Sequence, residues 1–192
     1  MQRSPGIILA WLGAFLLCVA PAGAQEVPSQ EFRALVRAAL NEPHEFRDEY
    51  DAEVWLKDMS LRLAKRAPHV SEKERFEVLR LVHREAQLAD LDPHVVLALI
   101  EVESNFDHYA ISSAGARGLM QVMPFWIDEI GQESDNLFDM ETNIRYGCTI
   151  LSLYLKKERH NLTHALARYN GSRGKVWYPD RVFRALKNRW AP

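Results

Sequence analysis

The sequence lacks the features that define several large classes of protein. It has 2 cysteines in 192 residues, too few for a fold held together by disulfides. Its 24 Lys and Arg residues are balanced by 26 Asp and Glu residues, whereas a dedicated nucleic-acid-binding protein usually shows a basic excess. The 7 histidines form neither an H-E-x-x-H motif nor a cluster with cysteine, so we expect no metal and no other cofactor. With 47% hydrophobic residues and a net charge of -2, the composition also excludes intrinsic disorder.

Long apolar runs are absent except near the N-terminus. Residues 7–20 are apolar apart from Gly13, Arg3 is the only charge in residues 1–24, and the small residues 22–24 follow a proline. This run is shorter than the roughly 18–20 residues of a membrane-spanning helix. The pattern therefore predicts a secretory signal peptide over residues 1–24, cleaved after Ala24, and no stable membrane insertion after its removal. The alternatives are an uncleaved anchor and lipidation at Cys18. Cleavage would leave Cys148, which we expect to be a buried small hydrophobic residue.

The rest of the chain shows helical rather than strand periodicity, so the predicted fold class is all-α. Three helix starts carry recognisable N-caps: Ser71 with Glu74 three residues later, Asp92 before Pro93, and Asp139. The predicted helices cover residues 31–40, 45–65, 72–89, 93–104, 119–123, 124–131, 140–157, 164–169 and 178–190.

Glu103 falls on an apolar face of its predicted helix. At about 100° of rotation per residue, it lies among the apolar side chains of residues 95–100, whereas Glu101 falls on the other side and is expected to be a solvated charge. A carboxyl group on a buried face should have a raised pKa, as a general acid near neutral pH requires. The alternative is a structural ion pair with Arg117 or Arg168, and periodicity alone favours that alternative.

Glu103 also opens an ordered series of short motifs. These are E-S-N-F at 103–106, A-x-S at 110–112, G-A-R-G-L-M-Q at 115–121, M-P at 123–124 and A-L-A-R-Y-N at 165–170. The series resembles the signature of the soluble lytic transglycosylases and extends over roughly residues 79–186. The chain departs from that signature at Ile150, at Gly171-Ser172, and before Tyr178, where Gly174-Lys175-Val176-Trp177 replace the family's usual Glu-Thr pair.

The resemblance implies a lysozyme-like helical domain, which we expect over residues 71–192, with a helical N-terminal extension over residues 25–70. It also implies an exported enzyme of the bacterial periplasm that acts on the glycan strands of peptidoglycan, with no nucleic-acid partner. In such enzymes a single glutamate is the acid and base, a role that passes to Glu103. The product would be a 1,6-anhydro-muramic acid end. The sequence gives no indication of protein partners.

The resemblance further implies substrate contacts by six residues: Ser112, Gln121, Met123, Tyr169, Asn170 and Tyr178. Each has an ordinary structural alternative, such as capping the loop for Ser112, a core methionine for Met123 and a core tyrosine for Tyr169. In the family, the hydroxyl of the residue at Tyr169 would lie near the acid and the sugar.

Two other functions remain open at this stage. A goose-type lysozyme, which is a hydrolytic muramidase, would need a second carboxylate acting across the sugar. The candidates for it are Asp107, Asp128, Glu129, Asp135 and Asp139. The other alternative is a peptidoglycan-binding protein without catalysis, although such a protein would have no need of Glu103.

Overall fold

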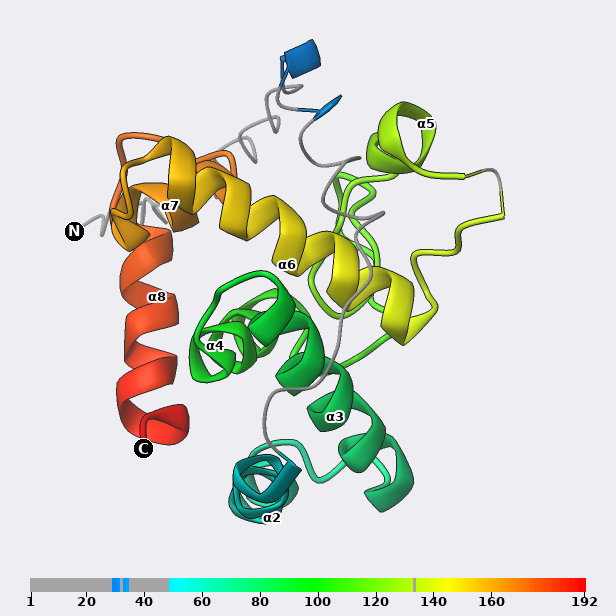
Figure 1. Cartoon of the computed structure of the whole chain (residues 1–192), viewed down its shortest axis with the longest axis vertical. Coiled ribbons are helices and arrows are strands. Elements are labelled where there is room, and N and C mark those ends of the chain that lie inside the picture. Colours follow the sequence, from blue (N-terminus) through cyan, green and yellow to red (C-terminus); the bar gives the residue numbers. More distant parts are fainter. Residues whose placement is uncertain (1–28, 32, 35–48, 133) are drawn as a thin grey trace, which may run out of the picture.

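The computed structural model describes residues 29–31, 33–34, 49–132 and 134–192. In chain order it contains α2 (Glu49–Arg66), α3 (Glu72–Leu88), α4 (Pro93–Glu103), α5 (Phe125–Ile130), α6 (Met140–Lys157), α7 (Leu162–Tyr169) and α8 (Trp177–Ala185), then the π-helical turn η1 (Leu186–Trp190) (Figure 1). Within these residues the only β-structure is two isolated bridges, so the all-α prediction is confirmed. The predicted signal peptide and most of the predicted helix over 31–40 lie outside the described residues.

The predicted helix starts are formed by the predicted side chains. Ser71 accepts a backbone N–H at 3.3 Å, and the carboxylates of Asp92 and Asp139 each accept one at 2.8 Å. These bonds satisfy N–H groups that have no partner inside the helix. Pro93 occupies the first turn of α4, where its missing N–H costs nothing. The start of α4, and with it the register that places Glu103 at its end, is therefore locally encoded.

The core of the domain is built around α4. This helix packs against α3, α8 and η1, and in Figure 1 it lies between α8 and α3. Residues 95–101 are all buried. Because residues 95–100 are all apolar, this part of the helix must be covered on all sides. The core continues into α6 and α7, which contribute the buried rings of Tyr146, Tyr154 and Tyr169. Cys148 is buried in this core, as predicted.

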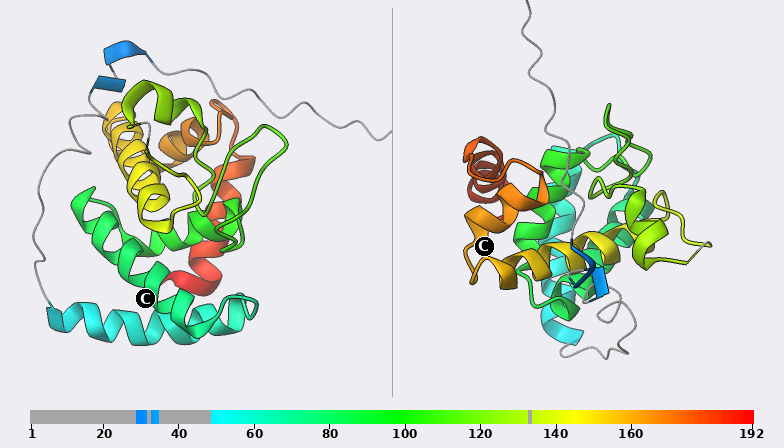
Figure 2. Two further views of the ribbon diagram at one scale, coloured as in Figure 1. Left: turned by 90° about the vertical axis from the view of Figure 1, so that its right-hand side faces the viewer. Right: turned by 90° about the horizontal axis from the view of Figure 1, so that it is seen from above.

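Helix α2 lies beside the C-terminal end of the chain. Figure 2 shows α2 along one edge of the molecule with the C-terminus next to it, and α2 contacts both α3 and η1. Met59 and Leu63 of α2, and Ala67 directly after it, are buried in the same apolar cluster as α4. Arg62 donates hydrogen bonds to the carbonyls of Arg189 and Ala191 at 3.1 and 2.6 Å. Residues far apart in the sequence thus form one packed unit.

The predicted helix over residues 119–123 is wrong. The segment is a turn closed by two bridges, Ile111 with Arg117 and Arg117 with Val122. Gln121 has a φ of 49°, which no residue of a right-handed helix adopts. The apolar spacing that suggested a helix is explained by burial, because Leu119, Met120 and Val122 all point into the core.

Candidate active site

Glu103 is the last residue of α4, and its carboxyl group meets the hydroxyl of Tyr178 in the first turn of α8. Tyr178 is 1% exposed and donates a hydrogen bond to Oε1 of Glu103. The two residues are 75 positions apart, so the packing of α4 against α8 creates the contact. Glu103 keeps partial exposure to solvent. One carboxyl oxygen is therefore anchored while the group remains accessible.

Burial controls the ionisation of Glu103. Removal of the carboxylate from water disfavours its charged form and raises its pKa from 4.5 to about 7. The hydrogen bond from Tyr178 and the positive charge of Arg181 act in the opposite direction. Burial, followed by the charge of Glu103, raises the pKa of Tyr178 well above its usual value, so its hydroxyl remains a donor at neutral pH. Near pH 7 a large fraction of the molecules carries a proton on Glu103, as general-acid chemistry requires.

Glu101 was predicted to be a solvated charge, and that prediction is wrong. Glu101 is 7% exposed and therefore buried. Oε1 pairs with Arg66 at 2.9 Å and with Arg189 at 2.5 Å, while Oε2 accepts from Arg189 at 2.7 Å and from the Trp190 indole at 2.8 Å. Burial alone would raise the pKa of Glu101, but the hydrogen bonds from Arg189, Arg66 and Trp190 outweigh it and hold the pKa below its usual value. The structural ion pair considered for Glu103 is therefore made by Glu101 instead.

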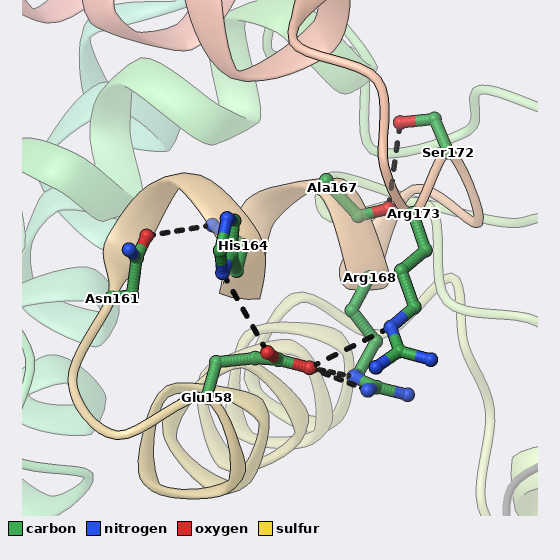
Figure 3. Close-up of polar contacts among 7 residues, drawn as sticks. All are labelled: Glu158, Asn161, His164, Ala167, Arg168, Ser172 and Arg173. Carbon is green, nitrogen blue, oxygen red and sulfur yellow. Dashed lines mark hydrogen bonds and ion pairs between the residues drawn. The ribbon is translucent and has the colours of Figure 1, made fainter.

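The two arginines considered as partners of Glu103 are engaged elsewhere. The Nε of Arg168 donates to Glu158 at 2.7 Å, and Figure 3 shows Arg168 beside that carboxylate at the junction of α6 and α7. The guanidinium of Arg117 lies 5.7 Å from the centroid of the Phe138 ring, within the range of a cation–π contact.

Ser112 and Gln121 fold the loop after α4 back on itself. Ser112 exchanges two hydrogen bonds with Ala116, each 3.0 Å long: its N–H donates to the carbonyl, and its hydroxyl accepts from the N–H. The amide nitrogen of Gln121 donates to the carbonyls of Ala110 and Gly118 at 3.1 and 2.9 Å. Both predicted substrate contacts thus have structural partners in the loop, and both side chains remain partly exposed.

Asn143 of α6 attaches this loop to the domain, and it was not among the predicted site residues. Its amide nitrogen donates to the carbonyls of Arg117 and Leu137, and its amide oxygen accepts from the N–H of Met120, each at 2.8 Å. At Gly118, which has a φ of 73°, a Cβ would lie 2.4 Å from the Asn143 amide nitrogen, so only glycine fits. The spacing of apolar residues could not reveal this role, because the partners of Asn143 lie in loops outside its own helix.

The remaining predicted site residues lie at different depths. Tyr169 is 4% exposed and donates to the carbonyl of Met120 at 2.8 Å. Burial, followed by the charge of Glu103, raises the Tyr169 pKa well above its usual value, so the ring lies within electrostatic reach of the acid although its hydroxyl bonds elsewhere. Met123 packs against the core while partly buried. Asn170 is the C-cap of α7 and partly exposed. The structure thus brings Tyr178 to Glu103 as its hydrogen-bond partner, whereas the Tyr169 hydroxyl bonds to the Met120 carbonyl.

Most of the other acidic residues considered for catalysis have structural partners. Asp107 accepts from the N–H of Tyr109 at 2.9 Å, Glu129 pairs with Arg33 at 2.6 Å, Asp135 accepts from the Tyr146 hydroxyl at 2.5 Å, and Asp139 caps α6. Asp128 is exposed on α5. Each of these placements matches an ordinary structural role for an acidic residue.

Neither a cluster of metal ligands nor a membrane-crossing helix occurs among the described residues. They contain no group of three or more His, Cys, Asp or Glu side chains that could hold a metal ion. None of the helices formed by these residues combines the length and the apolar character needed to cross a bilayer.

Comparison with known proteins gives the family. The chain is 31% identical over 140 positions to the membrane-bound lytic murein transglycosylase C of Photorhabdus laumondii. The aligned region covers 65% of this chain and 38% of that protein. Proteins of the same name from Yersinia pestis and Yersinia pseudotuberculosis are each 32% identical over 138 positions, covering 64% of this chain and 38% of theirs. The chain thus spans 38% of the length of these relatives. Residues 80–189, which include Glu103, Asn143 and Tyr178, match the Transglycosylase SLT domain, and the chain belongs to this family.

Proposed function

We propose that the protein is a peptidoglycan lytic transglycosylase in which Glu103 is the single acid and base. The observation that carries the proposal is the state of Glu103: a partly buried carboxyl group, anchored by Tyr178, with a pKa near 7. Family membership and the names of the relatives, all lytic murein transglycosylases, support the choice of substrate. The bond cleaved is the β-1,4 linkage between N-acetylmuramic acid and N-acetylglucosamine.

In the proposed reaction, protonated Glu103 donates its proton to the glycosidic oxygen as the bond from that oxygen to C1 of the muramyl residue breaks. The carboxylate then takes the proton of the muramyl C6 hydroxyl, and O6 bonds to C1 to give the 1,6-anhydro end. No water is consumed, and Glu103 regains its starting protonation. Because the nucleophile belongs to the substrate and is held beside the reacting carbon, no second carboxylate is needed.

The position of Tyr178 fits this cycle. Its hydroxyl holds Oε1 of Glu103, and we assign the transferred proton to Oε2. A donor on one oxygen stabilises the carboxylate that forms after proton transfer, while burial keeps the starting acid protonated. These opposing effects keep the pKa of Glu103 close to the pH at which it must both give and take a proton.

The placement of the other acidic residues supports transglycosylation over hydrolysis. An inverting muramidase would need a base some 6.5–9.5 Å from the acid to activate water. Asp107, Glu129, Asp135 and Asp139 have the structural partners described above, and Asp128 is exposed on α5. We therefore also propose that substrate contacts by Ser112, Gln121, Met123, Tyr169 and Asn170 orient the glycan rather than activate water.

Because the proposed substrate is peptidoglycan, the enzyme would act in the cell envelope, and we propose that it is located in the periplasm.

The test is digestion of purified sacculi by the full chain, followed by mass spectrometry of the released muropeptides. Wild type should release fragments with anhydro-muramic acid ends, lighter by one water than reducing ends. Glu103→Gln should lower release by orders of magnitude. The matched control is Glu77→Gln on the exposed side of α3, which should behave as wild type. Reducing ends in place of anhydro ends would establish a muramidase. Binding to sacculi without release of fragments, unchanged in Glu103→Gln, would establish a non-catalytic protein.

A further inference from the structure

The first turn of α8 presents an exposed indole beside the residue that holds the acid. Trp177 is 49% exposed and directly precedes Tyr178, which is 1% exposed and bonds to Glu103. The Trp177 and Tyr178 rings are 5.8 Å apart at an interplanar angle of 87°. Because the rings meet edge to face, the contact steadies the indole without stacking over it. The indole is therefore both exposed to solvent and held next to the residue that bonds to Glu103.

Arg181 lies one helical turn further along the same face of α8. Residues four apart in a helix are neighbours on its surface, so Arg181 and Trp177 share one side of α8. Arg181 is exposed, and its charge lowers the pKa of both Glu103 and Tyr178. Arg181 is also three positions after Tyr178 in α8, so it lies on the helix surface beside the residue that bonds to Glu103. The indole, the guanidinium and the acid are therefore neighbours at the same end of α8.

The connection that carries Trp177 is short and anchored. Only residues 170–176 separate α7 from α8. Ser172 bonds back to the carbonyl of Ala167 through its N–H at 2.7 Å and its hydroxyl at 3.4 Å, and Arg173 lies 4.0 Å from Glu158 (Figure 3). These contacts hold the loop against the junction of α6 and α7. They hold the loop that leads into α8, and the contact with the Tyr178 ring orients the Trp177 side chain.

We propose that Trp177 and Arg181 form a binding subsite for the muramyl residue next to the cleaved bond, with the indole stacked on the sugar ring and the guanidinium paired with a substrate carboxylate. This inference rests on the proposed function. The apolar face of a sugar ring matches a flat indole, and a guanidinium forms bidentate pairs with carboxylates. The carboxylate has two sources: the peptide stem, or the lactyl group of a glycan without peptide.

The experiment measures kcat and KM of the full chain on soluble glycan strands at pH 5.5, where Glu103 is largely protonated. Trp177→Ala should raise KM about tenfold, the loss of one stacking contact, with kcat within about twofold of wild type. Trp177→Phe should recover most of the affinity. Phe76→Ala, another exposed aromatic residue but on α3, is the matched control and should leave both constants unchanged. An unchanged KM in Trp177→Ala would overturn the subsite.

Arg181→Gln separates the two sources of the carboxylate. It is compared on strands with peptide stems and on strands from which an amidase has removed them, which frees the lactyl carboxylate. If KM rises about fivefold to tenfold only on strands with peptide stems, the carboxylate that pairs with Arg181 belongs to the stem. If KM rises only on strands without stems, that carboxylate is the lactyl group. If KM rises on both kinds of strand, Arg181 pairs with whichever of the two carboxylates the substrate carries. No increase on either overturns the role of Arg181.

Binding measurements separate failure of this inference from failure of the proposed function. They use Glu103→Gln, which keeps the subsite, with and without Trp177→Ala. If wild type cleaves glycan strands but the Trp177 variants have normal KM and Kd, the subsite is wrong and the transglycosylase remains. If wild type neither cleaves nor binds strands, both proposals are wrong. If it binds without cleaving, a tenfold weaker Kd in the double variant supports the subsite alone.

Discussion

Replacing Glu103 by glutamine is expected to stabilise the fold at alkaline pH while it removes activity. The folded-state pKa of Glu103 is about 7, compared with an ordinary value of 4.5. Between these values the folded protein holds a proton that the unfolded chain has released, so this carboxyl group lowers the stability as the pH rises from 4.5 through 7. At about 1.4 kcal/mol for each pH unit between the two values, the cost reaches about 3 kcal/mol above pH 7. Glutamine cannot ionise, and its carbonyl can still accept the hydrogen bond from Tyr178.

The measurement is urea unfolding of wild type and Glu103→Gln at pH 4 and at pH 8. The two proteins should have equal free energies of unfolding at pH 4. At pH 8 the variant should be more stable by up to about 3 kcal/mol, which corresponds to about 2–4 °C in Tm for each kcal/mol in a chain of this size. Glu77→Gln should change neither value. A Glu103→Gln protein that is less stable than wild type at both pH values would refute the reasoning, because the carboxylate would then be part of a stabilising ion pair.

Further predictions concern the acid and its supports. The kcat should fall as the pH rises through about 7, because Glu103 loses the proton that it must donate; a kcat that rises through this range would contradict the assignment. Tyr178→Phe removes a hydrogen bond that lowers the Glu103 pKa, so this limb of the pH profile should move to higher pH while the fold is retained. Glu101→Gln should destabilise the protein by about 2–3 kcal/mol in urea, below the 3–5 kcal/mol of a fully buried pair because its arginines are 35% exposed; equal stability would show that the pairs contribute nothing. Gly147→Ala should cost about 1–3 kcal/mol, because its Cβ would lie 2.4 Å from a buried methionine sulfur, and a wild-type Tm would refute that packing.

The sequence predicts those parts of the fold that depend on neighbours in the chain. Ser71, Asp92 and Asp139 start helices because each side chain bonds to an N–H two or three residues ahead, an interaction that a short motif contains in full. The predicted helix over 119–123 fails for the opposite reason. The N–H of Met120 is satisfied by Asn143, 23 residues away, and such a tertiary bond leaves the local apolar spacing unchanged.

The two glutamates of α4 show the same limit at the level of the site. A helical wheel assigns Glu103 to the apolar face and Glu101 to the opposite face, but it cannot say what covers either face. Glu101 is covered by residues 35 positions before it and 88 positions after it. The hydroxyl that binds Glu103 comes from 75 positions away. The candidate acid follows from its motif, whereas its hydrogen-bond partner depends on how α8 packs against α4.

The contacts of α2 have a practical consequence for anyone who trims this protein. A fragment limited to the family match would begin at residue 80, and it would discard Met59, Leu63 and Ala67 from a shared core. It would also discard Arg66, leaving the Glu101 carboxylate with fewer cations around it. The loss of Met59 and Leu63 alone removes roughly 1.5–3 kcal/mol of burial for each side chain, a large part of the roughly 5–15 kcal/mol that stabilises an ordinary domain. The smallest fragment that folds should therefore start before Glu49, well outside the borders that sequence similarity would draw.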